Sequence, residues 1–290
     1  MRRSRQLAGL LWTAPWWLGF LFFLAVPMAM SLYLSFCDYP LLQPPVFTGT
    51  QNYRQLAVDP VFHKVLGNTF IYAAGAIPLG TLVAVLLAVL LNRRVRGQGI
   101  FRTCIFVPTV VPVVATAVLW LWALNEQYGL LNQALGVAGI GGPAWLASPG
   151  WAMSSLILVS LWGVGSPVVI YLAGLQDVPE ELYEAARLDG ASPVRQFWHV
   201  TLPGISPVIL FNVIIAIIGT WQIFALPYVM SNPGPERGTY FYTMYLYDNA
   251  YRFLKMGYAS AMAWIQLVII LALTGLVFWV SRRMVHYRGA

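Results

Sequence analysis

Residues 66–91 read LGNTFIYAAGAIPLGTLVAVLLAVLL, and none of them is Asp, Glu, Lys, Arg or His. A helix needs roughly 20 mainly apolar residues to cross a hydrocarbon core of about 30 Å, so this stretch is long enough to span a membrane. Five further windows also lack these residue types, and they cover residues 10–36, 103–124, 151–175, 205–230 and 257–280. The windows are continuously apolar and do not alternate, which favours helices over barrel strands because unpaired backbone groups are very costly in lipid. We therefore predict an all-α, polytopic membrane protein with six transmembrane helices.

The composition of the whole chain agrees with a membrane protein. Of its 290 residues, 59% are hydrophobic and only 9% are charged, which leaves too little polar surface to cover a soluble globule. No segment differs in composition as a separate soluble domain would, and no repeat of fixed period is visible. The sequence therefore predicts a single transmembrane domain over residues 1–290.

The positions of Lys and Arg predict the orientation of the chain, because cytoplasmic loops collect these residues. Twelve of the 17 cationic residues lie on one side if the six windows cross the membrane in turn: Arg2, Arg3, Arg5, Arg93, Arg94, Arg96, Arg102, Arg187, Arg195, Arg282, Arg283 and Arg288. We predict that this side is the cytoplasm, with both termini there. The net charge of +7 is then a topology signal, and we expect no nucleic-acid partner.

One predicted cytoplasmic segment has its own local structure. Glu180 and Glu181 follow Pro179, which suits a first helical turn, and the two carboxylates favour the positive end of a helix dipole. We expect this helix to run to about Leu188. Gly190 then provides the residue that most easily takes a positive φ and closes a helix.

A second short helix should follow this bend. Ser192 and Pro193 suit the N-cap and the first turn, respectively. We expect the helix to stop before Pro203, because a proline ring disfavours helical geometry in the residue that precedes it. Residues 176–204 are thus predicted to form a helix–bend–helix segment.

Residues 184–207 read EAARLDGASPVRQFWHVTLPGISP and resemble the "EAA" loop of ABC importer permeases. The residues that carry this resemblance are Glu184, Ala185, Ala186, Asp189, Gly190, Ala191, Phe197, Val200, Leu202, Pro203 and Pro207. Three further segments resemble parts of the same family, namely residues 15–36, 67–73 and 257–266. The sequence also has a Gly-x-x-Asn-Tyr element at Gly49, Asn52 and Tyr53, which is similar to the one that sugar-importer permeases carry after their first span. The chain looks most like the sugar-importer branch, with its maltose and glycerol-phosphate types.

The resemblance implies a permease subunit of an ATP-driven importer in a bacterial inner membrane. Such a subunit translocates a sugar or a related polyol that an extracytoplasmic solute-binding protein delivers. The implied partners are two ABC ATPase subunits, a second permease subunit that we expect to be a different chain, the binding protein and membrane lipid. Two alternatives stay open: a self-contained secondary carrier for a neutral solute, and a permease for a non-sugar solute such as glycerol phosphate.

The resemblance also assigns roles within residues 176–204, which we call the coupling loop. The loop is implied to fit a cleft on the ATPase, where Glu184 pairs with a basic residue. Ala185 and Ala186 permit close approach, and Gly190 shapes the bend. The coupling set is completed by Asp189, Ala191, Phe197, Leu202 and Pro203.

A sugar is usually held by aromatic faces together with amide or hydroxyl groups. The fourth and fifth windows combine such groups, and the resemblance implies that the spans flanking the coupling loop line the translocation pathway. The candidate pathway residues are Trp162, Gly165, Ser166, Asn212, Thr220, Trp221 and Gln222. Helix packing is an alternative role for each of them.

Several motifs are missing from the sequence. It contains no Gly-x-x-x-x-Gly-Lys-Ser/Thr loop, so ATP and Mg are expected on a partner ATPase and no cofactor is expected on this chain. Its histidines, His63, His199 and His286, are scattered, which predicts neither a metal site nor a catalytic pair. The six windows carry no charge, which argues against an ion-driven carrier and against a membrane-embedded enzyme.

Overall fold

The computed structural model describes residues 12–93, 96–231 and 233–282, and it is almost entirely helical. The chain divides into two compact units, which we describe separately. Unit 1 comprises residues 1–60 and 245–268, and unit 2 comprises residues 61–244 and 269–290. Because the sixth window crosses the boundary, the long helix α16 (Met256–Ser281) belongs in part to each unit.

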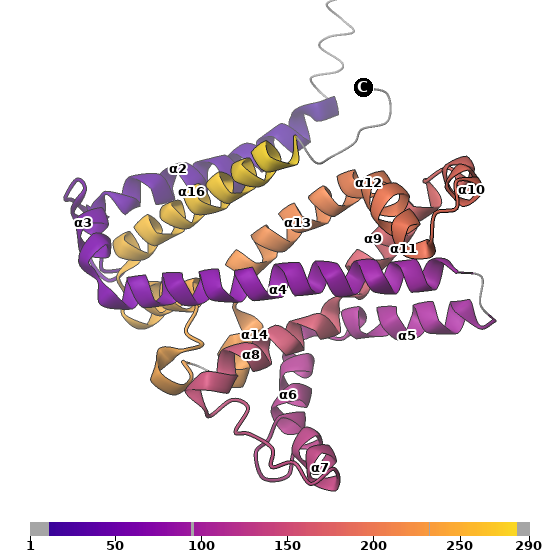
Figure 1. Cartoon of the computed structure of the whole chain (residues 1–290). Coiled ribbons are helices and arrows are strands. Elements are labelled where there is room, and N and C mark those ends of the chain that lie inside the picture. The colour runs from indigo at the N-terminus through magenta and orange to yellow at the C-terminus, as the bar shows by residue number, and fades with distance from the viewer. Residues whose placement is uncertain (1–11, 94–95, 232, 283–290) are drawn as a thin grey trace, which may run out of the picture. The chain divides into compact units, whose positions relative to one another are not determined.

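In unit 1, the first helical segment contains the π-helical turn η1 (Leu21–Ala25) and α2 (Val26–Ser35). The remaining elements of this unit are β1 (Cys37–Asp38), β2 (Val46–Phe47), α3 (Gln51–Val58) and the π-helical turn η5 (Asp248–Arg252). The two strands form one antiparallel pair in which Cys37 lies opposite Phe47. Helix α2 lies beside α16, and the indole of Trp264 donates a hydrogen bond of 3.1 Å to the hydroxyl of Ser31 (Figure 1).

The Gly-x-x-Asn-Tyr element fixes the chain that follows α2. The amide of Asn52 is buried and donates to the carbonyl oxygens of Ser35 and Cys37, both at 2.9 Å. The hydroxyl of Tyr53 lies 2.8 Å from that of Ser35, and Gly49 adopts a φ of +63° just before α3. These contacts hold α3 against the end of α2, so the element has a structural role.

Unit 2 begins with α4 (Pro60–Asn92), α5 (Gln98–Val110), α6 (Val113–Ala123), α7 (Leu130–Val137), α8 (Pro149–Ser160), η2 (Leu161–Gly163) and α9 (Gly165–Gln176). It continues with α10 (Glu180–Leu188), α11 (Pro193–Gln196), η3 (Phe197–Thr201), α12 (Leu202–Gly204), α13 (Ser206–Trp221), α14 (Ala225–Ser231), η4 (Pro235–Arg237) and the first half of α15 (Tyr242–Tyr247), whose last three residues belong to unit 1. In Figure 1, α6 turns sharply away from α5.

Among the described residues, three helices are long and apolar enough to cross a membrane: Trp12–Ser35, α4 and α16. Three bent pairs also qualify if each pair counts as one span, which brings the total to six. The pairs are Gln98–Val110 with Val113–Ala123, Pro149–Gly163 with Gly165–Gln176, and Pro193–Gly204 with Ser206–Trp221, bent by 100°, 51° and 67°, respectively. The fold is therefore all-α with membrane-spanning helices, as predicted.

The third, fourth and fifth windows are broken, whereas the sequence predicted continuous spans. Between α5 and α6, Val111 is extended (ψ 129°) because it precedes Pro112, and a proline disfavours helical geometry in that position. In the fourth window, the tight turn η2 interrupts the helix. The fifth window was expected to continue to Met230, but its helix ends at Trp221 and α14 follows separately.

An apolar cluster of unit 2 lies mainly between α4 and α9. Its members are buried: Ala84, Val85, Ala88, Leu91, Val168, Tyr171, Leu172, Leu175, Val178 and Ile205. Tyr183 and Phe197 of the coupling loop are partly buried and pack against this cluster. The core thus extends from the long helices into the base of the coupling loop.

The beginning of α4 is fixed to a distant part of unit 2. The buried amide of Asn68 donates to the carbonyl oxygens of Arg237 and Tyr240, at 2.7 and 2.9 Å. The hydroxyl of Thr69 accepts a hydrogen bond of 3.0 Å from the backbone N–H of Tyr242. Buried polar groups of this kind are costly to leave unpaired, so these contacts order the segment that precedes α15.

Candidate functional site

The first part of the coupling loop folds as its sequence predicts. Helix α10 covers Glu180–Leu188, with two carboxylates in its first turn, although Pro179 lies just before the helix as its N-cap. Gly190 has a φ of +74°. Its N–H donates to the carbonyl of Arg187 at 3.0 Å, and the N–H of Ala191 donates to that of Ala186 at 2.9 Å. This pair of hydrogen bonds is a Schellman motif, which ends the helix in a sharp bend.

The second helix starts as predicted but continues further. The side chain of Ser192 accepts a hydrogen bond of 3.4 Å from the N–H of Arg195, and Pro193 occupies the first turn. The expectation that the helix stops before Pro203 is wrong, because helical structure runs on through η3 and α12. In the wide turn of η3, the N–H of Leu202 donates to the carbonyl of Phe197. The missing N–H of Pro203 therefore falls in the first turn of α12, where it is tolerated.

Some side chains of the coupling loop hold its two helices together, and others are exposed on its surface. The hydroxyls of Tyr183 and Thr201 lie 3.0 Å apart and join the two helices of the loop. Glu184, Ala185, Asp189 and Gly190 are exposed, whereas Ala186, Ala191, Phe197, Leu202 and Pro203 are partly buried. The loop thus presents an acidic side chain beside small residues, on a support that is tied to the core.

Apolar side chains also protrude from the coupling loop. Leu188, Val194 and Trp198 are 90%, 67% and 59% exposed, respectively. None of these three was in the predicted coupling set. The sequence could have indicated them, because each is an apolar residue in a short helical segment that is expected to face solvent, where polar residues are favoured. Exposed apolar side chains of this kind, on a loop that also exposes Glu184, are suited to docking against another protein.

A second candidate site is a cavity of about 170 Å³ between α4, the α8–α9 pair and α13, which we call the intramembrane cavity. Its polar lining residues are Tyr72, Thr81, Ser160, Tyr171, Asn212 and Thr220. The amide of Asn212 donates to the carbonyl of Val208 at 2.9 Å, which leaves its oxygen as an acceptor. The cavity combines an amide, hydroxyls and two aromatic rings, and none of its lining residues is Asp, Glu, Lys, Arg or His.

Two of the seven predicted pathway residues, Asn212 and Thr220, line the intramembrane cavity. Ser166 and Gln222 are exposed and lie outside it, and Trp162 packs edge-to-face against Trp120 at 5.6 Å. The hydroxyls of Tyr72 and Thr81 on α4 were missed because the sequence interpretation considered only the fourth and fifth windows. Ser160 lies within the fourth window but was not chosen, because it is not next to the residues selected there.

Two predicted pathway residues make close packing contacts in the structure. Trp221 is 1% exposed and contacts the ring of Phe70 edge-to-face at 4.8 Å. A Cβ atom added at Gly165 would lie 2.8 Å from Cγ2 of Thr109 and would overlap the backbone oxygen of Ile105. Gly165 therefore permits the close approach of α9 to α5, and its absence of a side chain serves helix packing.

Comparison with known proteins places this geometry in a family. The model of the family described as "Binding-protein-dependent transport system inner membrane component" matches residues 76–286. The chain is 37% identical over 292 residues to the probable ABC transporter permease protein YesP of Bacillus subtilis strain 168, covering 99% of this chain and 94% of that protein. It is 33% identical over 282 residues to the lactose transport system permease protein LacF of Rhizobium radiobacter, covering 91% of this chain and 94% of LacF.

A solved structure has the same fold. A chain in the crystal structure of a bacterial ABC transporter involved in the import of the acidic polysaccharide alginate superposes with a TM-score of 0.84, at 24% identity and with 98% of each chain covered. The protein is thus a membrane-spanning permease component of an ABC importer, and not an enzyme. It belongs to the family of binding-protein-dependent transport system inner membrane components.

Proposed function

We propose that this permease subunit carries a sugar or a related polyol across the inner membrane and is driven through its coupling loop by a separate ATPase. The observation that supports the coupling role is the Schellman-closed loop, which exposes Glu184 while Tyr183 and Phe197 hold it against the core. In this proposal, one transmembrane permease domain extends over residues 1–290 and both termini are cytoplasmic. Two ATPase subunits, which bind ATP and Mg, and a second permease subunit complete the complex with the binding protein.

Only a few residues of the chain separate the coupling loop from the helix that lines the intramembrane cavity. Helix α11, η3 and α12 follow one another without a break and lead to α13, which lines the intramembrane cavity. Closure of the ATPase dimer would move the loop as a rigid body, because the Tyr183–Thr201 contact ties its two helices together. The bend of 67° between α12 and α13 is where such a movement would change the angle of α13.

The chemistry of the intramembrane cavity favours a neutral polyhydroxy solute. Hydroxyl and amide groups suit sugar hydroxyls, and the tyrosine rings offer faces for C–H groups. A phosphorylated solute is less well matched, because no Lys or Arg lines the cavity. The name of LacF, a lactose permease at 33% identity, also supports a sugar.

Asn212→Leu tests the role of the intramembrane cavity. Leucine has a similar volume but neither donates nor accepts hydrogen bonds, so a solute held by this amide loses about 1–3 kcal/mol of interaction. We expect ATP-dependent uptake to fall at least fivefold while the amount of assembled complex stays unchanged. Gln133→Leu, which changes an exposed amide on α7 outside the cavity, is the control and should retain most of the uptake. Equal uptake by the two variants would exclude Asn212 from the pathway.

Purification in a gentle detergent through a tag on this chain, followed by mass spectrometry, tests the proposed complex. We expect a P-loop ATPase and a second six-span permease to accompany the chain. Binding assays on the solute-binding protein of the same system, with lactose, arabinose oligomers and glycerol phosphate, would then identify the solute class. A homogeneous chain without an ATPase, under conditions that keep other membrane complexes intact, would favour the self-contained carrier instead.

A further inference from the structure

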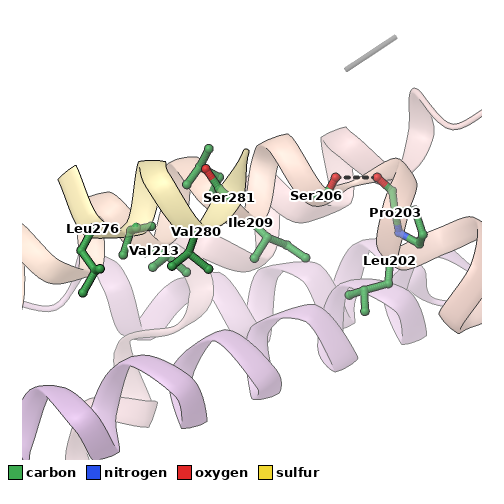
Figure 2. Close-up of a pocket in the computed structure, with 10 residues that line it drawn as sticks. Leu202, Pro203, Ser206, Ile209, Val213, Leu276, Val280 and Ser281 are labelled. Carbon is green, nitrogen blue, oxygen red and sulfur yellow. Dashed lines mark hydrogen bonds between the residues drawn. The ribbon is translucent and has the colours of Figure 1, made fainter. Parts of the chain in front are cut away.

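Two pockets of unit 2 border the second helix of the coupling loop. The larger pocket, of about 480 Å³, lies between α12–α13 and the last turns of α16, and Leu202 and Pro203 line it (Figure 2). Its walls are aliphatic, and its two hydroxyls, those of Ser206 and Ser281, donate to backbone carbonyls. This pocket therefore offers little to a polar ligand. The smaller pocket has a different chemistry.

The smaller pocket, which we call the loop pocket, has a volume of about 160 Å³ and lies between the ends of α4 and α9 and the coupling loop. Its lining residues are Val89, Asn92, Arg93, Leu175, Tyr183 and Thr201. Leu175 and Thr201 are buried and Tyr183 is partly buried, whereas Asn92 and Arg93 are exposed. The loop pocket thus brings a buried hydroxyl of the coupling loop together with a cation at the end of a membrane span.

The polar side chains of the loop pocket are hydrogen-bond donors. The guanidinium of Arg93 forms no ion pair within the described part of the chain. The side-chain amide of Asn92 likewise has no hydrogen-bond partner among the described residues. None of the lining residues is Asp or Glu. An arginine, an amide and hydroxyls without a carboxylate form a set that suits an anion.

The hydroxyl pair of the coupling loop has a hydrogen to offer. The hydroxyls of Tyr183 and Thr201 lie 3.0 Å apart, so one of their two hydrogens serves this contact. The one other contact of these hydroxyls with the described residues runs from Thr201 to the carbonyl of Gln196 and is 3.4 Å long. When Thr201 donates to Tyr183 instead, the phenolic O–H of Tyr183 can donate to a ligand. A bound anion would strengthen this arrangement, because hydrogen bonds to a charged acceptor are roughly twice as strong as neutral ones.

The end of α4 holds Arg93 at the loop pocket. The N–H of Arg93 donates to the carbonyl of Leu90 at 3.3 Å. The side-chain amide of Gln98 donates to the carbonyls of Leu91 and Arg93. These bonds occupy carbonyls at the negative end of the helix dipole, which would otherwise repel an anion. The planar guanidinium of an arginine matches the oxygens of a phosphate in a bidentate manner.

The volume of the loop pocket suits a phosphate group. A water molecule takes up about 30 Å³ in the liquid, so the pocket has room for roughly five non-hydrogen atoms, and a phosphate group has five. We propose that the loop pocket binds a phosphate group, either as the free ion or on a phospholipid headgroup, through Arg93, Asn92 and Tyr183. The bound phosphate joins the end of α4 to the coupling loop. Binding itself requires neither the ATPase nor a transported solute.

Thermal unfolding of the detergent-purified complex, titrated with inorganic phosphate against chloride at constant ionic strength, tests the free ion. At saturating phosphate, we expect the melting temperature of the wild type to rise by about 5 °C. Arg93→Gln should weaken phosphate binding at least tenfold, and Tyr183→Phe at least threefold. Arg96→Gln is the matched control, because Arg96 is also exposed but does not line the pocket, and it should bind as the wild type does.

Native mass spectrometry of the same complex, titrated with phosphatidic acid or with diacylglycerol of the same acyl chains, tests the phospholipid. If the lipid is the source of the phosphate, the wild type and Arg96→Gln should hold phosphatidic acid at least tenfold more tightly than diacylglycerol. Arg93→Gln should lose this preference, and inorganic phosphate should have little effect. The proposal is overturned if neither ligand shows binding that depends on Arg93. An equal loss in Arg96→Gln would also overturn it, since the effect would then be one of general charge.

Discussion

A Glu184→Lys permease is expected to reach the membrane in normal amounts but to take up solute at less than a tenth of the wild-type rate. Glu184 is exposed and makes no contact that supports the fold of the described loop, so stability should not change. In the proposed complex, this carboxylate is buried against a basic residue of the ATPase. Disrupting one partner of such a pair costs about 2–5 kcal/mol, and each 1.4 kcal/mol is a factor of ten in affinity.

Uptake into proteoliposomes, measured together with ATP hydrolysis, distinguishes a defect in docking to the ATPase from a defect in folding. The Glu184→Lys complex should lose uptake and the stimulation of hydrolysis by the loaded binding protein. Glu181→Lys makes the same charge change three residues earlier on α10, where the family resemblance assigns no role, and should retain at least half of the uptake. If both variants transport equally well, or equally poorly, Glu184 has no specific role in coupling.

Gly165→Ala is expected to destabilise the folded protein strongly, even though it adds only one methyl group. The new Cβ would overlap the backbone of Ile105, and it would also lie 3.0 Å from the Cα atom of Phe106. A backbone cannot yield as a flexible side chain can, so α5 and α9 must separate. Overpacking of this kind costs typically 1–3 kcal/mol, and we expect a value at the upper end. At roughly 2–4 °C per kcal/mol, the melting temperature should fall by about 6 °C or more.

Thermal unfolding in detergent, followed by the loss of monodisperse protein, measures this effect. Gly219→Ala is the matched control, because a Cβ atom at Gly219 in α13 meets nothing within 4 Å. Alanine is favoured over glycine inside a helix by about 1 kcal/mol, so this variant should be as stable as the wild type or more so. Equal melting temperatures for the two variants would contradict the close packing of α5 and α9.

The coupling loop shows which features of the fold could be predicted from sequence. The bend at Gly190 and the cap at Ser192 depend on local rules, in which one residue type satisfies the backbone of its neighbours, and both are found as predicted. The continuation of the helix through Pro203 was not predicted. It depends on the π-helical turn of η3, which includes Phe197, a residue that packs against the α4–α9 core. That contact joins residues far apart in the chain and has no local signature.

The membrane segments show the same difference between features with a local sequence signature and features that depend on long-range contacts. The absence of charge was enough to locate the membrane segments, but it did not reveal the breaks within three of them. Gly165 and Trp221 were chosen as pathway residues from their chemistry alone. A glycine or a tryptophan can serve either a solute or a neighbouring helix, and the sequence could not show that Gly165 lies against Ile105 or that Trp221 lies against Phe70.

The most direct test of the central claim is a photo-crosslinking experiment on the assembled transporter. Benzoylphenylalanine is placed at Ala185, which is exposed on α10, and in a second variant at Val137, which is exposed at the end of α7. Val137 lies in the segment predicted to face the other side of the membrane. The account predicts that irradiation joins Ala185, but not Val137, to a P-loop ATPase identified by mass spectrometry. A transport-active complex that gives no ATPase adduct at Ala185, or gives one equally at Val137, would contradict it.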